Sequence, residues 1–150
     1  MHRLNRNELI NKQPNVDPFL FIGDVQEIEI RKKILSNWEL REDYWFFRCH
    51  WPNNPNVPGA IQLEAVIQTS SLMFFADPQN KNDYIYISKI NLTRFFHKLR
   101  PLDVVQIDCQ VTKLRRGIAQ IQGKMTRNSS LVMQTNFELF LQNEVDYVSK

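Results

Sequence analysis

The fold is decided by residues 50–76, which read HWPNNPNVPGAIQLEAVIQTSSLMFFA. The part from about 58 to 76 predicts a helix, because Pro58 suits a first helical turn and apolar side chains recur at helical spacing on almost every side. A helix that is apolar on most faces belongs in the core of its protein. The one charged residue in this helix is Glu64, and a buried charge is unfavourable unless it is paired or used.

A histidine and a proline-rich loop precede this helix. His50 comes first, and the loop 52–58 holds three prolines and three asparagines, so regular secondary structure is not expected there. Gly59 then lets a ligand approach the backbone closely, at a helix N-terminus whose first N–H groups have no helical partner. The segment therefore offers a base, free hydrogen-bond donors and a buried acid close together in sequence.

Strand patterns dominate the rest of the chain. Apolar runs and alternating patterns predict strands at 19–22, 25–35, 84–92, 104–114, 118–125 and 131–141. Short turns between the last three strands predict an antiparallel meander. One long buried helix combined with antiparallel strands indicates the α+β class, with the sheet wrapped around the helix. Such a sheet leaves edges that dimerisation would cover.

Length and composition limit the class of protein. With 150 residues the chain is expected to form one domain, and its 43% of hydrophobic residues is enough for a packed core. A net charge of +3 is too weak to indicate nucleic-acid binding. Cys49 and Cys109 form no CxxC pair, so we predict neither a metal site nor a disulfide framework, and we expect a reducing compartment. Neither a signal peptide nor a membrane span is recognised.

The loop and helix together resemble the FabZ-type β-hydroxyacyl-acyl-carrier-protein dehydratases, which have the hot-dog fold. That family carries the motif H-F-P-x-x-P-x-x-P-G, with a glutamate five residues later. Here the same spacing gives His50-Trp51-Pro52, Pro55, Pro58-Gly59 and Glu64. Further segments resemble the family in the same order along the chain: 18–22, Arg94-Phe95, Pro101-Leu102-Asp103 and 113–123. The resemblance covers roughly residues 14–141.

The resemblance implies a single hot-dog domain over 1–150, with 1–13 and 143–150 peripheral, in which an antiparallel sheet wraps one long central helix. It implies a hydro-lyase that converts β-hydroxyacyl thioesters on acyl-carrier protein into trans-2-enoyl thioesters, in fatty-acid biosynthesis or a specialised lipid or polyketide route. No cofactor, metal, nucleic acid or membrane partner is expected, and the expected location is cytoplasmic. The expected unit is a homodimer in which His50 and Glu64 of one site come from opposite subunits; assembly into a trimer of dimers stays open.

Dehydration of such a thioester needs a base, a donor to the thioester oxygen and an acid. His50 suits the base, since an unperturbed histidine has a pKa of about 6.5. Glu64 suits the acid, because burial raises the pKa of a carboxyl group. The Gly59 N–H suits the donor. Gln68, one turn beyond Glu64, could hydrogen-bond it and orient the substrate.

Basic side chains form the candidate docking surface for an acidic carrier protein. The predicted set is Arg94, Lys98, Arg115 and Arg116, with Arg100 and Lys113 beside them.

Departures from the family pattern keep other functions open. Cys49, Lys98 and Leu102 stand where the family has glycine, proline and glycine, which favours a specialised relative. One alternative is a hot-dog thioesterase, and a second is a dehydratase–isomerase of the FabA type, which has aspartate where this chain has Glu64. A third is a non-catalytic carrier-binding module or the partner of a second subunit. Taken singly, His50 could be structural and Glu64 could pair with Arg48.

Overall fold

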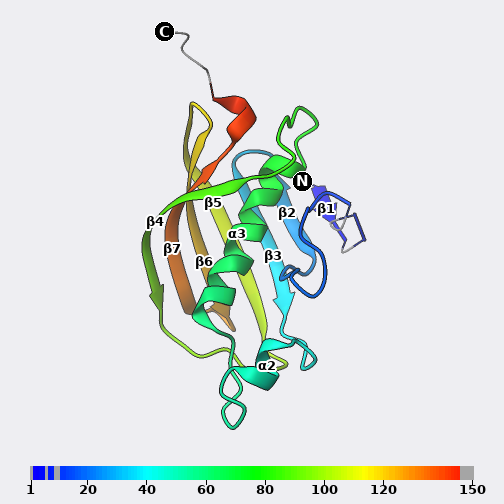
Figure 1. The fold of residues 1–150 in the computed structure, drawn as a ribbon, viewed down its shortest axis with the longest axis vertical. Coiled ribbons are helices and arrows are strands. Elements are labelled where there is room, and N and C mark those ends of the chain that lie inside the picture. The colour runs from blue at the N-terminus through cyan, green and yellow to red at the C-terminus, as the bar shows by residue number, and fades with distance from the viewer. Residues whose placement is uncertain (1, 6, 9–10, 146–150) are drawn as a thin grey trace.

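The computed structural model describes residues 2–5, 7–8 and 11–145, and in them a seven-stranded antiparallel sheet curves around one long helix (Figure 1). The strand order is β1-β2-β3-β5-β6-β7-β4. The elements are β1 (His2–Leu4), β2 (Val25–Glu29), β3 (Lys33–Glu39), α2 (Phe46–Cys49), α3 (Gly59–Phe75), β4 (Tyr86–Phe95), β5 (Val104–Arg115), β6 (Ile118–Arg127), β7 (Ser130–Phe140) and η1 (Gln142–Glu144). The predicted α+β class, with the sheet wrapped on a central helix, is confirmed.

Helix α3 begins where the sequence predicts. The carbonyl of Pro58 accepts the N–H groups of Ile61 and Gln62, both at 3.0 Å, so the proline closes the first turn without needing an N–H of its own. The helix ends at Phe75, and Ala76 caps it by donating to the carbonyl of Leu72 at 2.9 Å. Most residues of the helix are buried, and they lie on all of its faces, as expected for a helix inside a curved sheet.

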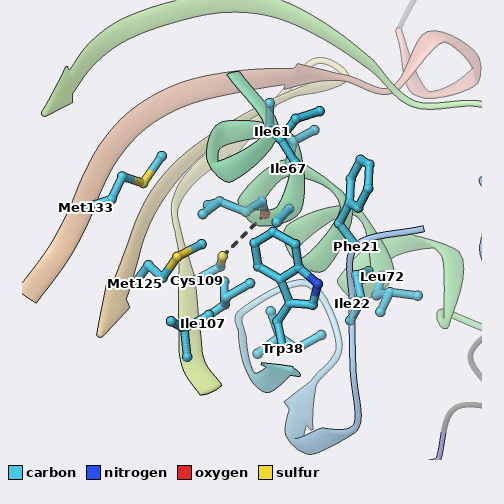
Figure 2. Packing of buried hydrophobic residues seen from close by; sticks show 14 of the residues in the cluster. Phe21, Ile22, Trp38, Ile61, Ile67, Leu72, Ile107, Cys109, Met125 and Met133 are labelled. Carbon is cyan, nitrogen blue, oxygen red and sulfur yellow. Dashed lines mark hydrogen bonds between the residues drawn. The ribbon is translucent and has the colours of Figure 1, made fainter. Parts of the chain in front are cut away.

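The helix lies directly on strands β5 and β6, where a glycine makes room for it. A Cβ on Gly123 of β6 would lie 2.4 Å from Cγ1 of Val66, which no side chain tolerates without a shift. Beside it, the thiol of Cys109 on β5 donates to the carbonyl of Val66 at 3.6 Å (Figure 2). The same core contains Trp38 and Leu72, both essentially inaccessible to solvent.

The stretch 19–22 joins no strand ladder, so its prediction as a strand was wrong. Its backbone is paired with a side chain instead. The N–H of Phe21 donates to Oε1 of Gln68 at 2.9 Å, and Nε2 of Gln68 donates to the carbonyl of Phe19 at 2.9 Å. A short apolar run looks the same in the sequence whether its backbone N–H and C=O groups pair with a neighbouring strand or with a glutamine side chain on the core helix. The sequence alone therefore does not distinguish the two cases.

The single strand predicted at 25–35 is a hairpin formed by β2 and β3, which turns at residues 30–32. Arg31 adopts a left-handed backbone with φ of 60°. Its guanidinium forms ion pairs with Asp77 and with Glu144 of η1, which hold it there. The turn contains no glycine, proline or asparagine, so the sequence carries no short-range signal for it.

The segments expected to be peripheral make specific contacts. β1 pairs with β2 at one sheet edge, and Gln13, only 4% exposed, donates from Nε2 to the carbonyl of Gln68 at 3.1 Å. At the other end, the N–H of Asn143 donates to Oδ1 of Asn82 at 2.9 Å. Residues 146–150 lie outside the described part of the chain.

Leu102 occupies a backbone conformation that suits glycine, with φ of 68° in the turn closed by the N–H of Asp103 on the carbonyl of Arg100 at 3.1 Å. We expect Leu102→Gly to be more stable than Leu102→Ala by about 1 kcal/mol, because both remove the exposed side chain but only glycine relieves the left-handed strain. Urea unfolding of the two variants measures this. An alanine variant as stable as the glycine variant would show that the turn is unstrained.

Candidate active site

His50 follows α2, and among the described residues only one of its two ring nitrogens has a hydrogen-bond partner. Its N–H donates to the carbonyl of Phe46 at 2.8 Å, and its Nδ1 lies 3.1 Å from the carbonyl of Asn56. A carbonyl only accepts, so Nδ1 carries the proton and Nε2 of the neutral ring keeps its lone pair. The indole of Trp51 stacks on the imidazole with ring centroids 4.8 Å apart. These contacts fix a ring whose outer nitrogen can take up a proton.

Glu64 lies on the second turn of α3 and is half-buried. Burial raises the pKa of its carboxyl group, and the hydrogen bond from Nε2 of Gln68, 2.9 Å from Oε1, lowers it by a smaller amount. The net effect favours the protonated, donating form at higher pH than in an exposed glutamate. Among the described residues Glu64 has no ion-pair partner, so the pairing with Arg48 considered from the sequence is not observed.

The side-chain amide of Gln68 is fixed in one orientation. Its oxygen accepts from the N–H of Phe21, and its nitrogen donates both to the carbonyl of Phe19 and to Glu64, each at 2.9 Å. If the amide were flipped, its NH2 group would face the N–H of Phe21 and its oxygen would face the carbonyl of Phe19, and neither pair can form a hydrogen bond. The backbone of Phe19 and Phe21 therefore determines that Gln68 presents an N–H, and never its oxygen, to Glu64.

We expect Gln68→Met to raise the pKa of Glu64 further, because the lost hydrogen bond favours the ionised carboxylate. A carbon-13 NMR titration of the glutamate carboxyl groups measures the shift without any substrate. Gln62→Met is the matched control, since Gln62 is buried on the same helix but donates to the carbonyl of Val57. A lower pKa in Gln68→Met would contradict the role given to Gln68.

Gly59 opens α3 and has two structural consequences. A Cβ at this position would lie 3.0 Å from the ring of Phe95 on β4, so glycine allows close contact between helix and strand. In the described part of the chain the N–H groups of Gly59 and Ala60 have no hydrogen-bond acceptor. These donors at a helix N-terminus can stabilise negative charge on an oxygen.

A cavity of about 410 Å³ lies beside Glu64. It follows α3 from Glu64 to Phe75, which is about 16 Å along the helix axis. Its lining residues are Gln13, Pro14, Asn15, Glu64, Ile67, Gln68, Ser71, Phe75, Tyr84, Ile85, Tyr86 and Ile87. His50 is not one of them, so one chain does not place both candidate catalytic groups around this cavity.

The basic residues predicted to dock a carrier fall into two groups. Arg94 lies at the end of β4 and Lys98 follows that strand. Both are near the His50 loop, which is held by the hydrogen bond from the N–H of Val57 to the carbonyl of Leu99 at 2.9 Å. Arg115 is the last residue of β5 and Arg116 lies in the turn to β6, at the opposite end of the sheet (Figure 1). The strand β5 between them is about 36 Å long. All four side chains are exposed, but one chain does not bring them together.

Several groups of the site could not be found by sequence reasoning. The Asn56 carbonyl and the backbone of Phe19 and Phe21 act through main-chain atoms, which leave no pattern in side-chain types. Gln13 comes from a segment with no periodicity. A polar residue just before Pro14 was the only available signal, and it is a weak one.

Two kinds of feature are absent from the described residues. No group of three or more histidine, cysteine, aspartate or glutamate side chains there could hold a metal ion. No helix there has the length and apolar character needed to cross a membrane.

Comparison with known proteins identifies a family and a fold. Residues 14–136 match the model of the FabA-like domain. The 3-hydroxyacyl-acyl-carrier-protein dehydratase FabZ of Alkaliphilus metalliredigens is 29% identical over 140 residues, covering 93% of this chain and 95% of the relative. The FabZ of Enterococcus faecalis is 31% identical over 112 residues, covering 75% of this chain and 78% of the relative.

Solved structures share the architecture at low sequence identity. The dehydratase heterocomplex ApeI:P from Xenorhabdus doucetiae aligns with a TM-score of 0.77 at 10% identity, over 91% of this chain and 93% of that chain. A hypothetical thioesterase from Streptococcus pneumoniae, solved with coenzyme A, aligns with a TM-score of 0.58 at 11% identity, over 79% and 86% of the two chains. The predicted hot-dog fold is confirmed; likeness at this identity carries no function.

Proposed function

The chain belongs to the family of FabA-like domains, and we propose on that premise that it is a hydro-lyase acting on β-hydroxyacyl thioesters of acyl-carrier protein. The product is the trans-2-enoyl thioester, made for fatty-acid or specialised lipid or polyketide biosynthesis. The observation that carries the proposal is Glu64, a half-buried carboxyl group with a raised pKa beside an elongated cavity. The FabZ relatives, which are named 3-hydroxyacyl-acyl-carrier-protein dehydratases, support the substrate class.

The three groups divide the reaction between them. Nε2 of His50 takes the α-proton, and the C–H electron pair becomes the second bond between the α and β carbons. The N–H of Gly59 stabilises the charge that grows on the thioester oxygen. Glu64 gives its proton to the β-hydroxyl, the C–O bond breaks, and water leaves. Transfer of the proton from His50 back to Glu64 through solvent restores the starting state.

A second copy of the chain completes the site in this proposal. Among the described strands, β4 is the last in the sheet order and pairs with β7 alone, so no described strand covers its other edge. Ile87, Ile90 and Phe95 of β4 pair with core residues of β7, yet each is 40–48% exposed. A second β4, paired antiparallel along this edge, would cover these apolar side chains and bring a partner His50 towards Glu64.

Antiparallel pairing of two β4 strands would also bring the two groups of basic residues close to each other. It would place the Arg94 and Lys98 end of one subunit beside the Arg115 and Arg116 end of its partner. An acidic carrier protein could then contact both groups at once. Trimers of such dimers are compatible with this arrangement. The two free thiols, Cys49 and Cys109, fit a cytoplasmic location.

Product analysis tests the function directly. The purified protein is incubated with β-hydroxyacyl thioesters of acyl-carrier protein of several chain lengths, and the acyl-carrier mass is followed. We expect loss of one water from the carrier-bound acyl group, with the enoyl thioester as product. Release of the free carrier thiol would indicate a thioesterase instead. An unchanged carrier at every chain length, although it binds, would overturn the enzyme proposal in favour of a binding role.

A further inference from the structure

The cavity beside Glu64 is lined by both polar and apolar side chains. Seven of its twelve lining residues carry polar side chains. Buried polar groups that face methylene groups lose their hydrogen bonds with water and gain nothing in return. Among the described residues, the side chains of Asn15, Tyr84 and Tyr86 have no hydrogen-bond partner, although both tyrosines are more than half exposed to water. The lining therefore offers hydrogen bonds that an alkyl chain would leave unmade.

Gln13 is the buried member of this lining. It is 4% exposed, and its Nε2 donates to the carbonyl of Gln68 at 3.1 Å, which anchors the amide on α3. Its Oε1 is buried and has no donor in the described part of the chain. A buried acceptor without a donor destabilises a fold by about 1–3 kcal/mol. Because Gln13 also lines the cavity, a ligand bound there could supply the missing donor.

The position of Gln13 indicates which part of a substrate it would meet. Its anchor, the carbonyl of Gln68, lies four residues beyond Glu64, which is about 6 Å along the helix axis. The cavity continues in the same direction to Ser71 and Phe75. With the reacting carbons at Glu64, the groups around Gln13 would contact the distal part of the acyl chain.

We propose that Gln13 is a specificity-determining residue, whose Oε1 accepts a hydrogen bond from a hydroxyl group on the distal part of the acyl chain. The substrate class is then a β-hydroxyacyl thioester with a second, distal hydroxyl group. Oε1 of Gln13 is buried in the free chain, so the hydroxyl group must displace part of the surrounding lining to reach it. The inference rests on the proposed function, because it assumes that the acyl chain of a dehydratase substrate occupies this cavity.

A competition between two substrates tests the proposal. The protein is given two β-hydroxyacyl carrier thioesters of equal chain length, one ending in a methyl group and one carrying a distal hydroxyl. We expect a higher kcat/KM for the hydroxylated chain, and we expect Gln13→Met to reduce this preference by about tenfold, mainly through KM. Methionine keeps the length of the side chain and removes the acceptor.

Gln62→Met is the matched control. Gln62 is also 4% exposed, its Nε2 also donates to a backbone carbonyl, and its Oε1 also lacks a donor, but it does not line this cavity. This control should keep the wild-type preference. A substrate with a methyl ether in place of the hydroxyl adds a test on the unmodified protein, since the ether has no donor and should lose the advantage even if Gln13→Met fails to fold.

The outcomes separate the two proposals. Equal kcat/KM for alkyl and hydroxylated chains in the wild-type protein would overturn the role of Gln13 and leave the dehydratase function standing. A preference that survives in Gln13→Met, or that the methyl ether shares, would also overturn it. Turnover of neither chain would overturn the proposed function, and the inference would fall with it.

Discussion

His50→Ala and Glu64→Gln are each expected to lower kcat for β-hydroxyacyl dehydration by about 10²–10⁴-fold. Alanine removes the Nε2 lone pair that the Asn56 carbonyl leaves free. Glutamine keeps the shape of Glu64 but has no acidic proton to give the departing hydroxyl. Steady-state kinetics on one carrier-bound substrate measures both. Activity within a few fold of wild type in either variant would remove that residue from the reaction.

Mixing the two inactive variants gives a sharper result. If each site takes His50 from one subunit and Glu64 from the other, a heterodimer of His50→Ala and Glu64→Gln has one intact site and one site lacking both groups. Random pairing makes half of the dimers heterodimers, so roughly a quarter of the wild-type activity should return. Activity is measured after unfolding and refolding the mixture, with each variant refolded alone as the control. No recovery would mean that both groups act within one chain.

The stability of Glu64→Gln, measured against pH, tests whether unfolding causes the expected loss of activity. Because burial raises the folded-state pKa of Glu64, folding favours its protonated form. The stability linked to that proton is complete below the unfolded-state pKa and is lost as pH rises through the folded-state pKa. Glutamine never ionises, so the variant should gain stability relative to wild type as pH rises. Thermal unfolding at several pH values checks this. A variant whose stability falls relative to wild type as pH rises would contradict it.

Gly123→Val is expected to destabilise the protein by about 3 kcal/mol, at the upper end of the range for overpacked cores. The first added carbon would lie 2.4 Å from Cγ1 of Val66, and Thr135 and Cys109 close the site on the other sides at 3.5 and 3.6 Å. The helix would have to lift from β6, which shifts every group that α3 carries. Urea unfolding measures the change.

A compensating substitution tests the cause of this loss. Val66→Ala removes the methyl group that the new side chain would meet. The double variant Gly123→Ala with Val66→Ala should therefore lose less free energy of unfolding than the two single variants lose together. Gly23→Ala provides a comparison in which the clash is with the backbone carbonyl of Asn37 and cannot be relieved by trimming a side chain. If the losses of stability of the two single variants simply add in the double variant, the contact with Val66 is not the cause of the destabilisation at Gly123.

Long, regular elements were predictable from the sequence, and elements held by specific side chains were not. The helix predicted at about 58–76 is Gly59–Phe75, and the strands predicted after it occur at Tyr86–Phe95, Val104–Arg115, Ile118–Arg127 and Ser130–Phe140. In β5, β6 and β7 alternate residues are buried, so the alternating pattern determines these strands, whereas nearly all residues of β4 are exposed. The turn at Arg31 instead depends on Asp77 and Glu144, which are distant in sequence.

The candidate site divides in the same way. His50, Gly59 and Glu64 were found because their spacing along the chain is itself the signal. Gln68 was found from its helical distance to Glu64, and the hydrogen bond is present. The restraint on Gln68 by the 19–21 backbone and the unpaired oxygen of Gln13 depend on contacts between segments about fifty residues apart. No local pattern encodes such contacts.

The thiol of Cys109 packs against Val66 inside the sheet, and burial raises its pKa far above the usual range for cysteine. It is therefore inert to maleimide reagents, whereas Cys49 is exposed beside His50. The unmodified protein can thus carry a single fluorescent dye next to the reaction centre, with no cysteine introduced or removed. Emission from such a dye would time the arrival and departure of the carrier in a stopped-flow instrument.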